Sequence, residues 1–448
     1  MLPYNQENIV AVATPPGVGA LAVVRLSGAN LKALFKSFTH KIPKNRFATF
    51  TRVYHPIKNT VLDEAVVTYF ESPNSFTGED VIEISCHGGE AVKNSIIHAA
   101  LDGGARLAGP GEFSFRSFLN GKIDLLQAEA VSALISSKTI LSTEISLHHL
   151  GGKVSTILLD IKSRIIDVLS LIENELNFSE NEIDLTASSV LRSKILEVQL
   201  QIKKMLESSV FYKNIFSGVR IIIYGKPNSG KSSLFNAILG HNKSIISSSP
   251  GTTRDAIEAW FELEGVPVCL VDTAGVWDSE EPLDTLGVEK TLSELKRADL
   301  CLLVDEKDPE SLVDPSFRLN YQHHYIMVKS KSDLHRSSSK PERGVVCTSS
   351  LENTGINKLL TYISTYIHDN INISDVSNNM LITQRQRGLL AVAGQCLDET
   401  LVLLDAGVET DVIASTLQGF VVSIKDVVGE IPNKEVIQNI FSNFCVGK

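Results

Sequence analysis

The amino-acid sequence predicts a multidomain fold that combines an α+β domain, an all-α helical domain and an inserted α/β domain with a parallel sheet. Three observations support this prediction. Short apolar runs alternate with glycine turns over residues 1–118, and apolar residues recur at helical spacing from about residue 125 to 211 and again after residue 369. Between them, strand and helix patterns alternate, as in a parallel sheet. The predicted domains are 1–118, 119–214, 215–370 and 371–448.

Length and charge narrow the class of protein. The 448 residues suffice for about three domains with separate cores. The net charge of −10 argues against a surface that coats nucleic acid, so a local patch or a partner protein must supply positive charge to any nucleic-acid substrate. Six cysteines lie scattered without a C-x-x-C pair, which suits a reducing compartment. We find no secretory signal and no membrane-spanning run, and expect a cytoplasmic protein.

The first and second predicted domains differ in periodicity. Strands are expected over residues 9–13, 20–26, 47–54, 65–70 and 81–86, with a helix over 89–101. Long, paired helices are expected to follow, since apolar residues recur at helical spacing through 128–134 and 157–172. The acidic stretch 180–184 is interpreted as a solvated loop between helices.

The stretch 225–232 reads G-K-P-N-S-G-K-S and lies between an apolar run at 219–224 and a helix-forming segment. This G-x-x-x-x-G-K-S pattern, in the strand–loop–helix context it requires, is the phosphate-binding P-loop. Its glycines let backbone N–H groups turn toward phosphates, and Lys231 is expected to reach the β and γ phosphates. The Ser232 hydroxyl is expected to bind Mg²⁺. The predicted contacts here are Asn228, Ser229, Gly230, Lys231, Ser232 and Ser233.

Two downstream motifs suit nucleotide hydrolysis. The strand at 268–271 ends in D-T-A-G, where Asp272 would assist Mg²⁺ through water and the Gly275 N–H could sense the γ-phosphate. The P-G-T-T-R-D stretch at 250–255 occupies the place of a switch loop, and Thr253 is predicted to bind Mg²⁺. The nucleotide contacts predicted from these stretches are Ser247, Ser248, Ser249, Pro250, Gly251, Thr252, Thr253, Asp272, Thr273, Ala274 and Gly275.

A base-reading motif is expected after the next apolar strand. Its usual form is N-K-x-D, and this chain has Ser330, Lys331, Ser332 and Asp333 there. Asp333 would accept the guanine N1–H and N2–H₂ protons while the Lys331 stem packs on the base, so the sequence favours GTP despite the serine. Ser349, Ser350 and Leu351 would supply the N–H that contacts the guanine oxygen, although they also fit an ordinary serine-rich loop.

The order of these motifs resembles that of the MnmE/TrmE, Era and Der GTPases. The flanking sequences resemble one family, the MnmE (TrmE) tRNA-modification GTPases. They are N-S-F-T-G-E-D at 74–80, C-H-G-G at 86–89, P-G-E-F at 110–113, F-L-N-G-K-I-D-L at 118–125 and a terminal C-V-G-K at 445–448. The resemblance covers essentially the whole chain.

The resemblance implies a folate-binding N-terminal domain and a homodimer joined through it. It also implies a heterotetramer with the flavoprotein MnmG that modifies C5 of the wobble uridine (position 34) of certain tRNAs by a carboxymethylaminomethyl-type addition. The one-carbon unit would come from 5-formyltetrahydrofolate or a related tetrahydrofolate. The folate residues carried over are Arg25, Glu83, Lys122 and Lys448, a set whose cations suit an anionic glutamate tail.

The same resemblance implies a K⁺ ion beside the phosphates, held by oxygens of Asn228, Ser247, Ser249 and Thr252. The family's catalytic glutamate falls on Asp284, whose side chain is one methylene shorter, so we expect a slow GTPase. Arg254 is a second catalytic candidate. Cys445 is a third, either as a reactive thiolate or simply as a residue that packs the end of the last helix.

Two alternatives remain open from the sequence. One is a regulatory GTPase switch, for example in ribosome assembly, without a modification role of its own. The other is a folate-binding protein whose nucleotide domain has decayed, an alternative that Ser330 and Asp284 keep open. GTP binding would separate the second alternative from the leading interpretation.

Overall fold

The computed structural model describes residues 7–177, 188–209, 212–241, 245–247, 257–272, 293–313, 317–318, 321, 324–334, 344–370, 382–430, 434–442 and 444–447. The chain divides into two compact units. Unit 1 contains residues 1–132, 148–198 and 392–448, and unit 2 contains residues 133–147 and 199–391.

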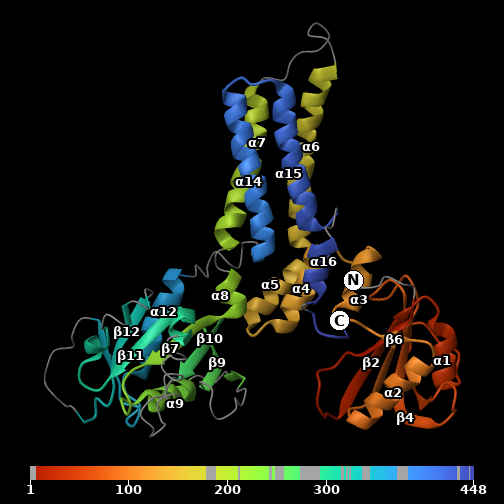
Figure 1. Cartoon of the computed structure of the whole chain (residues 1–448), viewed down its shortest axis with the longest axis horizontal. Helices are drawn as coiled ribbons and strands as arrows, with labels where there is room; N and C mark the ends of the chain where they lie inside the picture. The colour runs from red at the N-terminus through yellow and green to blue at the C-terminus, as the bar shows by residue number, and fades with distance from the viewer. Residues whose placement is uncertain are drawn as a thin grey trace. The chain divides into compact units, whose positions relative to one another are not determined.

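Unit 1 begins with a sheet of order β3-β4-β5-β2-β1-β6, in which all pairs are antiparallel except β1 with β6. Helices α1 and α2 pack against it (Figure 1), and Phe35, Phe38, Val67 and Ile84 are buried in the shared core. The predicted strands and helix all form. The elements are β1 (Ile9–Val12), β2 (Leu21–Gly28), α1 (Leu31–Thr39), β3 (Thr49–Tyr54), β4 (Val61–Phe70), β5 (Asp80–His87), α2 (Glu90–Asp102) and β6 (Arg106–Leu107).

Helices make up the rest of unit 1. The long helices α6 and α15 lie side by side (Figure 1), and Arg192 on α7 pairs with Asp405 on α14. Buried residues at helical spacing, such as Leu158, Ile161, Ile165 and Val168, form the inner face of α6. The helices that lie wholly or mostly in unit 1 are α3 (Glu112–Leu119), α4 (Leu125–Ser136), α6 (Lys153–Asn177), α7 (Ser188–Ser208), α14 (Gln384–Asp405), α15 (Thr410–Val428) and α16 (Lys434–Ser442), whereas α5 (Ile140–Leu150) lies mostly in unit 2.

Unit 2 contains a sheet of order β13-β12-β11-β7-β10-β9-β8. Strands β7, β10, β11, β12 and β13 are parallel, whereas β9 and β8 add on as antiparallel strands. The predicted parallel sheet is therefore mixed at this edge, because a tight Glu264–Gly265 turn joins β9 directly to β10. The elements are α8 (Tyr212–Ser217), β7 (Val219–Tyr224), α9 (Lys231–His241), β8 (Ile245–Ser247), β9 (Ile257–Leu263), β10 (Val266–Asp272), β11 (Leu300–Asp305), η3 (Pro309–Leu312), β12 (His324–Lys329), β13 (Val345–Cys347) and α12 (Ile356–Asn370).

A contact in unit 2 was not anticipated from the sequence. Ile145 on α5 is buried in the core beneath the sheet, and Leu141 packs beside Gly265 in the β9–β10 turn. Lys138 lies 3.0 Å from the centre of the Trp260 ring on β9. The segment between α4 and α5 is thus fixed to the strand pair that follows the predicted switch loop.

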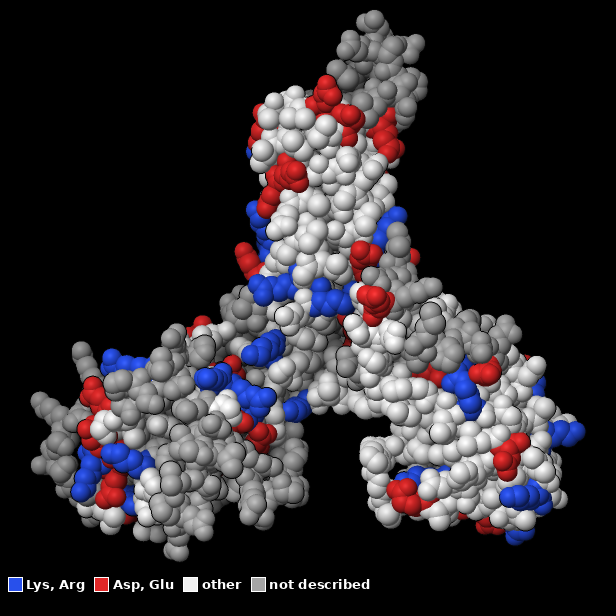
Figure 2. Space-filling view, viewed as in Figure 1, with Lys and Arg blue, Asp and Glu red and all other residues white. Residues whose placement is uncertain are grey.

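The surface carries charges of both signs. On the face in Figure 2, Lys and Arg lie interspersed with Asp and Glu, without a continuous basic field among the described residues. Within the described part of the chain, no helix is long and apolar enough to cross a membrane.

Candidate nucleotide-binding site and the Arg25 cluster

The candidate nucleotide site lies where the parallel strands of unit 2 end. The P-loop follows β7, Glu306 follows β11, the base-reading motif follows β12 and the 349–351 loop follows β13. Carboxyl ends of parallel strands meet at one edge of a sheet, so these four loops converge. Asp272 ends β10 and pairs with Ile223 on β7, which places it beside the start of the P-loop.

The P-loop backbone adopts conformations that only a few residue types tolerate. Gly230 has φ +91° and Asn228 has φ +60°, both in the left-handed region. At Gly225 a Cβ atom would lie 2.1 Å from the carbonyl oxygen of Val304 on β11, so no side chain fits there. Steric constraints therefore explain why Gly225 and Gly230 are glycines. Helix α9 begins at Lys231, directly after the loop.

Two P-loop side chains are almost fully buried. Lys231 is 4% exposed, and its Nζ donates to the carbonyl oxygen of Lys226 at 2.9 Å, which folds the side chain back over the loop. The Ser229 hydroxyl is buried and has no hydrogen-bond partner among the described residues. Ser232 and Ser233 are exposed on the first turn of α9. An orphaned hydroxyl, a lysine and a helix N-terminus in one turn fit a phosphate ligand.

The base-reading motif is tied to the P-loop by two hydrogen bonds. The Ser330 hydroxyl donates to the carbonyl oxygen of Ser229 at 2.6 Å, and Lys331 Nζ donates to that of Asn228 at 2.9 Å. Ser330 is 4% exposed, and its N–H donates to Asp305 O on β11. Ser330, which stands in place of the usual asparagine, therefore links the two loops directly.

Asp333 is fixed by the neighbouring loop. Its Oδ1 accepts a 2.5 Å hydrogen bond from Ser349 Oγ, and the Ser349 backbone exchanges two hydrogen bonds with Thr354. A further hydrogen bond, from Glu352 N to Ser349 Oγ, completes a tight turn. Ser349 is thus buried and serves to orient Asp333, whereas Leu351 is 86% exposed.

A groove of about 600 Å³ joins α9 to the loop after β13. It brings together three residues predicted to bind nucleotide, Ser233, Ser350 and Leu351. Its other lining residues are Asn236, Ala237, Gly240, His241 and Asn353, of which His241 Nε2 and Asn353 Oδ1 form a 2.6 Å hydrogen bond. No sequence pattern indicated these residues, because only the packing of α9 on the loop assembles them.

Several predicted site residues lie outside the described residues, and of Ser247 only the backbone is described. They include the Mg²⁺ candidate of the switch loop, two of the four K⁺ candidates and two catalytic candidates. These residues are Ser248, Ser249, Pro250, Gly251, Thr252, Thr253, Arg254, Thr273, Ala274, Gly275, Asp284 and Lys448.

In unit 1, two of the predicted folate residues lie together. Arg25 on β2 forms an ion pair with Glu83 on β5, with Nε and Nη2 at 2.9 and 2.8 Å from the same oxygen. Arg25 Nη1 also donates to the carbonyl oxygen of Gly447 at 3.3 Å. The Arg25 guanidinium carbon lies 5.8 Å from the ring centres of Phe76 and Phe113. We call Arg25, Glu83, Phe76, Phe113 and Gly447 the Arg25 cluster.

The C-terminal tail packs closely against the backbone of unit 1 where it contacts this cluster. Val446 pairs with Pro110, and a Cβ on Gly447 would lie 2.3 Å from the carbonyl oxygen of Val12. Phe444 is buried beside Phe441, but Cys445, the next residue, is exposed. The packing interpretation of Cys445 is therefore wrong, because the two phenylalanines, not the thiol, fill the core.

The sequence did not predict a role for some residues of these sites. Glu306 lies 3.2 Å from Lys331 Nζ, and its position directly after a buried strand was the signal that could have identified it. Phe76 lies inside the 74–80 motif but had no assigned role. Lys122 adjoins this region, since a Cβ on Gly78 would lie 3.2 Å from Lys122 Cγ.

Known proteins resemble this chain over both the N-terminal and the helical regions. A family model described as GTP-binding protein TrmE N-terminus matches residues 8–122, and one described as MnmE helical domain matches residues 125–445. Proteins named tRNA modification GTPase MnmE match along their length. One from Ligilactobacillus salivarius (strain UCC118) is 35% identical over 100% of this chain and 99% of its own. One from Aquifex aeolicus (strain VF5) is 36% identical over 99% and 100%.

Among solved structures, the G domain of the T. maritima FeoB iron transporter is 27% identical over 33% of this chain and 98% of its own, with a TM-score of 0.27. The full-length relatives and the two family models confirm the resemblance drawn from the motifs. This chain belongs to the MnmE (TrmE) family of tRNA-modification GTPases.

Proposed function

We propose that this protein hydrolyses GTP and uses the resulting conformational change in the modification of tRNA. The observation that carries the proposal is the pair of hydrogen bonds from Ser330 and Lys331 to the P-loop carbonyls of Ser229 and Asn228. These bonds hold the base-reading and phosphate-binding loops at a fixed spacing, as one guanine nucleotide spanning both loops requires. The relatives' name, tRNA modification GTPase, supports the same conclusion.

In this proposal each described group has a role in binding. Lys231, released from the Lys226 carbonyl, neutralises phosphate charge, and α9 adds its N-terminal partial charge. Ser232 and Asp272 fit a Mg²⁺ ion because they offer hard oxygen donors. Asp333, oriented by Ser349, accepts the guanine N–H protons. Bound Mg²⁺ would supply electrostatic stabilisation of the transferred phosphoryl group.

The finer parts of the proposal rest on the family. K⁺ would activate the GTPase through Asn228, Ser247, Ser249 and Thr252. Asp284 and Arg254 would assist catalysis, and Cys445 would have a role in the modification. The protein would act in the cytoplasm as a homodimer whose GTPase domains associate with each turnover. With MnmG it would modify C5 of the wobble uridine, with a one-carbon unit from a tetrahydrofolate bound by Arg25, Glu83, Lys122 and Lys448.

The test is GTP hydrolysis by the purified protein in K⁺ and in equal Na⁺, with ATP as the control nucleotide. We expect turnover of GTP but not of ATP, and faster turnover in K⁺. Equal use of ATP would contradict the assignment of Asp333. Equal rates in the two salts would contradict the cation site while leaving GTP hydrolysis intact.

A further inference from the structure

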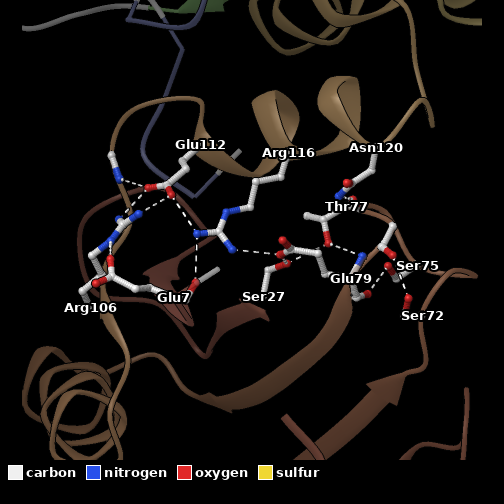
Figure 3. Close-up of polar contacts among 12 residues, drawn as sticks. Glu7, Ser27, Ser72, Ser75, Thr77, Glu79, Arg106, Glu112, Arg116 and Asn120 are labelled. Atoms are coloured by element: carbon white, nitrogen blue, oxygen red, sulfur yellow. Dashed lines mark hydrogen bonds and ion pairs between the residues drawn. The ribbon is translucent and has the colours of Figure 1, made fainter. Parts of the chain in front are cut away.

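A buried ion network in unit 1 joins Arg106 and α3 to the loop between β4 and β5 (Figure 3). Glu112 on α3 accepts bonds from both terminal nitrogens of Arg106 and from Arg116, and Arg116 also bonds Glu79 at 2.9 Å. The Arg116 and Glu112 side chains are each 2% exposed. Removing such charges from water is costly, so a network of this kind is maintained only where every group is paired.

The network ends on the loop formed by residues 72–79, between β4 and β5. Glu79 Oε2 accepts from Arg116 and, at 2.8 Å, from Ser27 Oγ on β2. Ser27 Oγ also lies 2.7 Å from Thr77 Oγ1, and both residues are fully buried. Figure 3 shows this chain of contacts running from Arg106 to the loop. The loop is thus anchored to β2 and to α3 through buried groups.

The loop backbone is held from α3 as well. Ser117 Oγ donates to the carbonyl oxygen of Phe76 at 2.7 Å, and Asn120 Nδ2 donates to that of Thr77 at 2.7 Å. Within the loop, Ser75 Oγ donates to Glu79 O. Loops of this length are normally among the least constrained parts of a protein, but here consecutive carbonyls are fixed by side chains from a helix and its C-terminal cap.

This anchoring fixes the backbone that carries a partly exposed aromatic ring. Phe76 is the one large apolar side chain of the 72–79 loop and is 38% exposed. The Arg25 guanidinium carbon lies 5.8 Å from the centre of this ring and 5.8 Å from the centre of the fully buried Phe113 ring, and the guanidinium is also paired with Glu83. The stem of Lys122 adjoins Gly78 in the same loop.

We propose that Phe76 is a ligand-binding residue that stacks on the pterin ring of a tetrahydrofolate, and that Ser117 positions it. The inference rests on the proposed folate function of the Arg25 cluster. A flat aromatic face beside a carboxylate and a cation matches a flat ring with N–H donors linked to an anionic tail. Because hydrogen bonds already fix the backbone that carries the ring, binding costs little of the loop's conformational freedom.

The experiment measures binding of 5-formyltetrahydrofolate to the full-length protein by calorimetry. Competition with p-aminobenzoylglutamate, which keeps the tail but lacks the pterin, reports on tail binding alone. In the variant Phe76→Ala we expect about tenfold weaker binding of 5-formyltetrahydrofolate, since base–aromatic stacking contributes on that order. The affinity for p-aminobenzoylglutamate should stay unchanged. Phe76→Trp should retain binding. Ser117→Ala should weaken it by a smaller factor.

The matched control is Phe47→Ala, which removes an exposed phenylalanine of the same domain and should leave both affinities unchanged. If Phe76→Ala binds 5-formyltetrahydrofolate as the unmodified protein does, the inference is wrong. It is also wrong if both ligands are lost equally, because that result means a collapsed loop. If the unmodified protein binds neither ligand, the folate function itself fails.

Discussion

The nucleotide site and the Arg25 cluster use charge differently. In the nucleotide site, backbone geometry dominates: Gly225 and Gly230 allow the P-loop to turn, and the Lys231 ammonium donates to a backbone carbonyl of the same loop. Around the Arg25 cluster, side chains of opposite charge pair with one another, as Arg25 does with Glu83 and Arg116 does with Glu112. In the nucleotide site, the Lys231 ammonium is therefore positioned to bind a phosphate. Around the Arg25 cluster, the charged side chains already neutralise one another without a ligand.

This difference predicts how the two regions respond to mutation. Removal of a group from the nucleotide site should change function more than stability, because its charges act mainly on the ligand. Removal of a group from the buried network should reduce stability first, because each charge there is compensated by another protein group. The following predictions test that contrast, from the largest expected effect to the smallest.

The variant Arg116→Met should lower the free energy of unfolding by about 3–5 kcal/mol, because it removes the arginine of the half-buried Glu79 and one of the two arginines that pair with the buried Glu112. Urea unfolding followed by circular dichroism measures this change. Arg52→Ala is the control, since Arg52 forms an exposed ion pair with Glu64 and its loss should hardly affect stability. Equal effects of the two variants would contradict the contrast between buried and exposed pairs.

The variant Lys231→Ala should reduce GTP turnover by about 100- to 1000-fold, the typical effect of losing one group that stabilises transition-state charge. Unfolding by urea should be little changed. The control is Lys226→Ala, because the Lys226 side chain is exposed and its carbonyl, which contacts Lys231, is retained in the variant. Turnover near the unmodified rate in Lys231→Ala would remove the P-loop lysine from the mechanism.

The pH dependence of stability should report on Glu112. Burial by itself would raise the pKa of this carboxyl, but the Arg106 guanidinium, the Gly109 N–H and Arg116 outweigh it and lower the pKa below its usual 4.5. Glu112 therefore stabilises the fold above about pH 4.5, and this contribution is lost as the pH falls through the lower pKa of the folded state.

Stability measured from pH 7 to pH 3 checks this prediction. The variant Glu112→Gln should start less stable at pH 7 and lose less stability on acidification than the unmodified protein. Parallel curves for the two proteins would show that other carboxyl groups account for the acid sensitivity.

The smallest expected effect concerns Ser330. The variant Ser330→Ala removes the hydrogen bond to the Ser229 carbonyl, and we expect GDP affinity to fall by about five- to tenfold, as a single hydrogen bond contributes about 1 kcal/mol. Fluorescence titration with a labelled GDP measures it. Ser311→Ala is the control, since Ser311 is an exposed serine of unit 2 outside the predicted site and its hydroxyl donates to the Asp308 carbonyl of its own turn. Unchanged affinity in Ser330→Ala would mean that the link between the loops does not influence binding.

The P-loop could be predicted in detail because its chemistry is local. Adjacent residues supply the turn, the cation and the helix N-terminus, so the order of residue types specifies the geometry. The strands of unit 1 could be predicted for a similar reason, since alternation along a strand is a property of neighbours. The pairing order of those strands and the antiparallel addition of β9 were not predicted, because register and strand order depend on contacts between distant segments.

By itself, then, the sequence determined the fold class, the nucleotide motif and the family of this protein. Tertiary structure alone decided that Arg25 bonds the Gly447 carbonyl, that Phe76 is held beside Arg25, and that Ser330 bridges to the P-loop. The physical reason is separation along the chain. These groups come from segments tens to hundreds of residues apart, and only packing of the folded chain determines which side chains meet.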